Sequence, residues 1–198
     1  MSELRAQIED STLDLSTIEA HLDGLGAESR VAEIRSLGRK QQAKLFEAAA
    51  GHRPVSLRDL VPTSAPPMQE VVHFGKNTLP AFSTFAKVFA RPDEESSERL
   101  WGYNRAGGFV ETVVGPGYFV AREADDEGEV LVDYLEVPPA HPPGWPEILP
   151  NSARLSAFVY NGTQDILRGV SEHVTIGRAY KRGKALSAWF VLCRDASG

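Results

Sequence analysis

The stretch EHVTIGRAYKRGKALSAWFVLCR, residues 172–194, gives the clearest indication of β-structure in this chain. It has two runs rich in β-branched and aromatic residues, separated by the segment KRGK around Gly183. A glycine between polar residues that interrupts two such runs is typical of a β-hairpin turn. The end of the chain is therefore predicted to be a hairpin of two antiparallel strands.

Arg178 stands out within this hairpin. Side chains alternate between the two faces of a strand, so Arg178 shares a face with Val174 and Ile176 and is expected to point inward. A buried charge without a partner is costly. We therefore expect Arg178 to pair with Asp133 or Glu136 of the acidic segment 121–136, or with an anionic group of a ligand.

The middle of the chain shows the same rhythm of short apolar runs and turns. Such a rhythm favours an antiparallel sheet that is strongly curved or closed. The predicted fold is α+β, an N-terminal helical hairpin followed by a curved, barrel-like antiparallel sheet with short helices. The candidate strands are 68–77 (which also fits a short helix), 83–92, 99–104, 109–114, 118–123 and 130–137.

The N-terminal part, residues 1–53, is predicted to form two long helices. Apolar residues recur at helical spacing up to Leu22 and again from Val31, and Gly24 and Gly26 interrupt the pattern. The apolar stripe of such a hairpin must be covered. We expect a homodimer through residues 4–49.

The rest of the chain divides into a linker and a body. Four prolines within residues 54–67 forbid a long helix, so this segment is predicted to link the hairpin to a β-rich domain at 68–198. The proline-rich loop 138–151 is expected to be ordered and to carry Trp145 over the body as a lid. Residues 152–170 are predicted to hold one or two short helices.

Composition argues against several functions. The net charge of −6 lacks the basic face that nucleic-acid binding requires. Cys193 is the one cysteine, and the five histidines are far apart in the sequence, so neither a disulfide nor a metal site is expected. The sequence has neither an apolar signal segment nor an apolar run long enough to span a membrane. We expect a cytoplasmic protein, and the sequence identifies no cofactor.

The candidate site residues fall into two groups. His73 and Lys76, in the segment HFGKN, are suited to holding an anion or to acid–base work. Tyr103 and Tyr134 are expected to line the curved sheet together with Tyr118 and Trp189, and Trp145 is expected to cover the ligand from the lid. Arg178 or Lys76 is expected to hold an anionic end.

These residues favour a small-molecule-binding protein for an apolar or amphipathic anion. One alternative is an enzyme that uses His73, Lys76, Asp133 and Tyr134. The other is an adaptor whose helices bind a partner.

Overall fold

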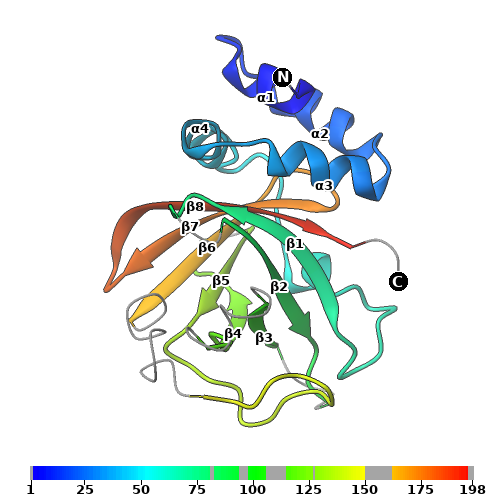
Figure 1. Ribbon diagram of the computed structural model, residues 1–198, viewed down its shortest axis with the longest axis vertical. Coiled ribbons are helices and arrows are strands. Elements are labelled where there is room, and N and C mark those ends of the chain that lie inside the picture. Colours follow the sequence, from blue (N-terminus) through cyan, green and yellow to red (C-terminus); the bar gives the residue numbers. More distant parts are fainter. Residues whose placement is uncertain are drawn as a thin grey trace.

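The computed structural model describes residues 2–80, 83–93, 98–105, 115–126, 128–149 and 162–195. Eight antiparallel strands form a closed barrel in which each strand pairs with its neighbours in sequence, and β8 pairs with β1 (Figure 1). The strands are β1 (Val71–Asn77), β2 (Thr84–Ala90), β3 (Leu100–Arg105), β4 (Phe119–Glu123), β5 (Glu129–Asp133), β6 (Thr163–Gly169), β7 (Val174–Lys181) and β8 (Lys184–Arg194). The predicted α+β fold with a barrel-like antiparallel sheet is confirmed.

The terminal hairpin is confirmed as β7 and β8, joined at Arg182 and Gly183. Both turn residues have positive φ, 51° and 74°, as a two-residue hairpin turn requires. The register of the pairing between β7 and β8 shifts between Arg178 and Tyr180, which marks a β-bulge.

One prediction for the middle of the chain is wrong. Residues 163–169, expected to be helical, form β6, and their alternating burial matches a strand with one inward face. Pairing with β5 and β7 on both sides outweighs the local helical pattern, because tertiary pairing overrides weak propensity. The predicted strand 109–114 and the helical residues 152–160 lie outside the described residues.

The helices are more numerous and shorter than predicted. The N-terminal part holds α1 (Glu3–Glu9), α2 (Leu15–Asp23), α3 (Ala27–Arg35) and α4 (Arg39–Ala48) instead of two long helices. The first expected helix is split because Asp10 accepts the Thr12 backbone N–H in a turn and Asp14 caps α2. The second is split at Gly38, the N-cap of α4.

These helices cover one side of the barrel, over β7, β8 and β1 (Figure 1). Their apolar residues join Val174, Ile176, Val191 and Cys193 of the outer barrel face in one buried cluster, the helix-side core. The apolar stripe is therefore covered by the chain's own barrel. The homodimer stays a prediction, but the argument from an uncovered stripe no longer supports it.

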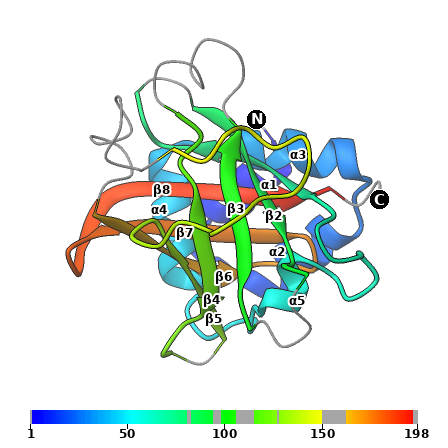
Figure 2. The same cartoon turned by 90° about the horizontal axis from the view of Figure 1, so that it is seen from below.

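Two further segments complete the fold. The short helix α5 (Leu57–Leu60) closes one end of the barrel, where Val55, Leu60 and Val61 join the core of the barrel interior. Apolar side chains from the expected linker are thus buried against the body, and the division at 1–53, 54–67 and 68–198 remains a prediction. Residues 134–149, the strap, cross the barrel on the side away from the helices (Figure 2).

Candidate functional site

The most unusual feature of the barrel interior is a buried lysine. Lys87 lies at an inward position of β2, flanked at alternate positions by the half-buried Phe85 and the fully buried Phe89. Its side chain is 2% exposed. Lysine is almost never buried to this degree without partners.

Three polar side chains surround its ammonium. Nζ of Lys87 lies 3.1 Å from Oδ2 of Asp165 and 3.2 Å from Oδ1 of Asn104, and it also donates a hydrogen bond to the Tyr134 hydroxyl. The Asn104 side-chain amide donates to Tyr134 at 3.0 Å and to the Gly117 carbonyl at 3.1 Å. We call Lys87, Asn104, Tyr134 and Asp165 the lysine cluster.

The cluster spans the barrel. Lys87 belongs to β2 and Asp165 to β6, and in the closed order of eight strands three strands separate these two in either direction. Asn104 comes from β3, next to β2, and Tyr134 directly follows β5, next to β6. The ion pair therefore joins opposite walls across the interior.

Aromatic rings complete the surroundings of the ammonium. Nζ lies 4.8 Å from the ring centroids of Phe119 and Tyr134 and 4.9 Å from that of Phe190. Cation–π attraction offsets part of the cost of removing the ammonium from water. Two glycines make room for these rings. A Cβ at Gly102 would lie 2.3 Å from the Phe119 ring, and a Cβ at Gly177 would lie 2.2 Å from the Phe190 ring.

Burial shifts the pKa of both charged members of the cluster. Loss of water lowers the pKa of Lys87, and the Asp165 carboxylate acts against this change. Loss of water likewise raises the pKa of Asp165, against the attraction of Lys87 and the hydrogen bond from Tyr134. Loss of water thus disfavours the charged form of each group, whereas the attraction between the two groups favours the charged forms.

Burial differs on the two sides of the cluster. Toward α5 the interior is filled by Phe89, Phe119, Val132 and Leu167, none of which is accessible to water. Toward the opposite end, which we call the far end, the inward positions Asn77, Phe85, Ala179 and Ala188 are only half-buried. The cluster thus lies between a part of the interior that water does not reach and a part with more accessible side chains, although Thr163 at the far end is also buried.

The surface near the far end adds to this difference. Leu79 and Leu135 are the two large apolar side chains that are exposed in the described part of the chain, at 42% and 62%. Leu79 follows β1 and Leu135 follows β5, so both lie at the far end.

His73 faces the same interior, nearer to α5. It is directly opposite Lys87 in the pairing of β1 with β2, and its Nε2 lies 2.9 Å from the Leu60 carbonyl oxygen. Burial lowers its pKa to about 4, so the ring is neutral near pH 7. Its Nδ1 has no hydrogen-bond partner among the described residues.

The expected enzyme residues are divided between the two faces of the sheet. His73 and Tyr134 face the interior, whereas Lys76 lies on the outer face and donates to the Arg35 carbonyl. Asp133, on the outer face of β5, accepts a hydrogen bond of 2.8 Å from Gln164. The structure does not bring these four residues together.

The expected aromatic lining is also divided, and three of its residues were assigned to the wrong face. Tyr103 and Tyr118 lie on the outer face, where they pack with Trp145 of the strap. Trp189 packs against the helix-side core. Trp145 donates from Nε1 to Glu70 and covers the barrel wall, so the strap is not a lid over the barrel end.

Arg178 shares a face with Val174 and Ile176 as predicted, but its partner was wrong. Its NH1 lies 3.2 Å from Oε1 of Glu47 in α4, and its guanidinium lies 5.1 Å from the Trp189 ring centroid. The helices cover this outer face of the barrel, so their side chains and not those of the acidic segment are within reach. Arg178 therefore does not point into the barrel.

Lys87, Asn104 and Asp165 were missed by the sequence analysis. A signal existed for Lys87, because a lysine between Phe85 and Phe89 at alternate positions of a strand must face the same way as they do. No comparable signal marked Asp165, whose segment was assigned to a helix.

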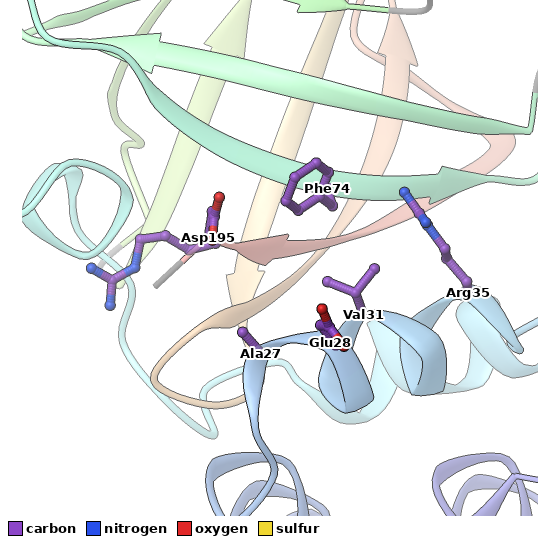
Figure 3. Close-up of a pocket in the computed structure, with 7 residues that line it drawn as sticks. Ala27, Glu28, Val31, Arg35, Phe74 and Asp195 are labelled. Carbon is purple, nitrogen blue, oxygen red and sulfur yellow. The ribbon is translucent and has the colours of Figure 1, made fainter. Parts of the chain in front are cut away.

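Two depressions lie on the outer surface of the described chain. One, of about 410 Å³, lies between α3, β1 and the end of β8, and its lining includes Val31, Phe74 and Asp195 (Figure 3). The other, of about 660 Å³, lies beside α5, and its lining includes Arg58, Arg91 and Arg122. Both carry side chains of both charge signs at their edges.

Across the described residues, no group of three or more potential metal-binding side chains occurs. None of the helices in this part of the chain is long and apolar enough to cross a membrane.

These features define the chain as a closed eight-stranded antiparallel barrel with a helical cover and an ionic cluster across its interior. Comparison with known proteins gives no match, neither to a protein family nor to a curated protein or a solved structure.

Proposed function

We propose that the barrel binds a small, mainly apolar or amphipathic molecule in its interior, between the lysine cluster and the far end. The observation that carries this proposal is the position of the buried cluster, between the inaccessible part of the interior and the more accessible inward side chains of the far end. Small-molecule sites are typically apolar, with a few convergent polar groups that fix the orientation of the ligand.

Stability alone is a poor reason for such a cluster. Replacing a buried ion pair by apolar residues of similar volume is often neutral or stabilising, so an ion pair of this kind is weak evidence for a structural role. Ionisable groups with shifted pKa values also concentrate at functional sites. Both arguments favour a role for Lys87 and Asp165 beyond holding the barrel together.

The polar end of the ligand follows from the charge of the cluster. Asp165 already compensates Lys87 at 3.1 Å, so a ligand carboxylate would compete with it. A neutral carbonyl or hydroxyl group would instead exchange hydrogen bonds with Lys87, Tyr134 and Asn104. We therefore favour a neutral polar end over the anionic end that the sequence suggested.

A ligand series of constant chain length tests this proposal. We expect octanol and octanal to raise the melting temperature of the protein by mass action, and octanoate to raise it less. Ala179 lies opposite Asp165 in the pairing of β6 with β7 and thus shares its inward face, so Ala179→Leu should abolish the shift. Ala185→Leu, at an exposed position of β8, is the matched control and should keep it.

No shift with any of the three ligands in the wild-type protein would contradict the proposal. An equal shift in Ala179→Leu and wild type would place the ligand outside the barrel interior.

An enzyme remains a second candidate. His73 and Tyr134 both face the barrel interior, but the His73 ring is hydrogen-bonded to the Leu60 carbonyl on the α5 side of the cluster. The adaptor alternative has less support, because the apolar faces of α1–α4 are buried in the helix-side core.

A further inference from the structure

We infer that Lys87 is a nucleophilic amine that forms a reversible imine with an aldehyde or ketone ligand inside the barrel. This inference rests on the proposed function, because the carbonyl compound must first reach the barrel interior. It adds the chemical class of the ligand and a covalent step.

An imine-forming lysine needs an uncharged amine, which is the nucleophilic form. Lys87 is placed to supply one. Its ammonium is surrounded by the rings of Phe119, Tyr134 and Phe190, and Asp165 is the one acidic group that the described structure pairs with it. A desolvated lysine in an apolar pocket is one of the ways in which proteins obtain a reactive amine.

The same site supplies an acid. Asp165 lies 3.1 Å from Nζ, so transfer of one proton along this hydrogen bond leaves an amine and a carboxylic acid with little movement. Burial shifts the pKa of each group in the direction that favours this transfer. The Tyr134 hydroxyl, hydrogen-bonded to Nζ and to Asn104, provides a second route for the proton.

The reaction then proceeds in two balanced steps. The Nζ lone pair of Lys87 attacks the carbonyl carbon, the C=O π bond breaks, and the oxygen takes the proton of Asp165. The resulting carbinolamine passes one Nζ proton to the Asp165 carboxylate and receives it back on its hydroxyl, which leaves as water. The C=N bond forms without any change in the oxidation state, and water reverses the sequence.

No other lysine of the chain has this environment. The remaining five, Lys40, Lys44, Lys76, Lys181 and Lys184, are exposed or half-buried. Lys44 and Lys76 donate to backbone carbonyls near the surface. Water can solvate their ammonium groups, so selective reaction at Lys87 is a property of the barrel interior.

Reductive trapping tests the inference on the full chain. The protein is incubated with octanal and sodium cyanoborohydride at neutral pH, and modified sites are located by peptide mass mapping. We expect Lys87 to be modified before the five other lysines. Asp165→Asn should slow modification of Lys87 by about 10²-fold, the usual contribution of a positioned acid, whereas Lys184→Met should leave its rate unchanged.

The wild-type map decides the question even if a variant fails to fold. Modification of the other lysines without Lys87 would overturn the inference. In that case a melting shift with octanol, which has no carbonyl group, tells whether the proposed function fails as well. A melting shift with octanol would support ligand binding without the covalent step. No shift with octanol or octanal would reject both the imine and the proposed function.

Discussion

Lys87→Met tests whether the ion pair across the barrel is buried as described. The separation of 3.1 Å between Nζ and Oδ2 of Asp165 gives an attraction of about 5 kcal/mol at an effective dielectric constant of about 20. Desolvation offsets much of this attraction in the intact pair. Removing only the lysine leaves that cost with Asp165, and we expect the free energy of unfolding to fall by about 3–5 kcal/mol.

The loss should depend on pH. Without Lys87 the pKa of the Asp165 carboxyl is raised further in the folded state, whereas in the unfolded chain it stays near 4. The folded variant then holds a proton that the unfolded chain releases as pH rises above about 4, so the variant loses stability with rising pH. We expect a larger deficit relative to wild type at pH 8 than at pH 5.

Equilibrium urea unfolding, followed by tryptophan fluorescence at both pH values, measures these differences. Lys87→Met combined with Asp165→Leu removes both charges and should recover most of the loss. Lys184→Met, at an exposed position, is the control for loss of a lysine and should change stability by less than about 0.5 kcal/mol. A deficit in Lys87→Met below about 1 kcal/mol, or one that is equal at pH 5 and pH 8, would show that Asp165 is not a buried, uncompensated carboxyl group in the variant.

Three further outcomes are expected. The pKa of His73 is about 4 in the folded state and near 6.5 in the unfolded chain, so wild type should lose about 3 kcal/mol of stability as pH falls from 6.5 through 4. His73→Gln should lack this part of the acid sensitivity. An equal pH dependence of urea unfolding in the two proteins would contradict the prediction. Arg178→Met should lower the free energy of unfolding by only about 1 kcal/mol, because its partner Glu47 is 66% exposed and exposed ion pairs contribute little. A loss of about 3–5 kcal/mol would instead support a buried, inward-pointing Arg178. A chain that starts at Pro54 lacks the helices that cover Val174, Ile176 and Val191. It should aggregate or bind a hydrophobic dye, which light scattering and dye fluorescence detect. A monomer without dye binding would show that the helical cover is dispensable.

The candidate site was only partly accessible from the sequence. His73 and Tyr134 were named and do face the barrel interior, and Trp145 packs against the barrel wall. Tyr103 and Lys76 lie on the outer face. Alternation along a strand tells which residues share a face, but it does not tell which face is the interior when both faces are covered, and here the helices and the strap cover much of the outside.

Sequence patterns were sufficient to predict β2 to β5 and the terminal hairpin, because these depend on local alternation and on turn residues such as Gly183, but β6 was predicted to be helical. These patterns also predicted that residues near the N-terminus are helical, although the caps at Asp14 and Gly38 were missed. Which segments contact one another could be seen only in the folded structure. Lys87 and Asp165 are 78 residues apart, and closure of the barrel, with β8 paired to β1, places their strands on opposite walls of one interior. A contact between such distant residues leaves no local pattern in the sequence, because it depends on the register of every strand between them.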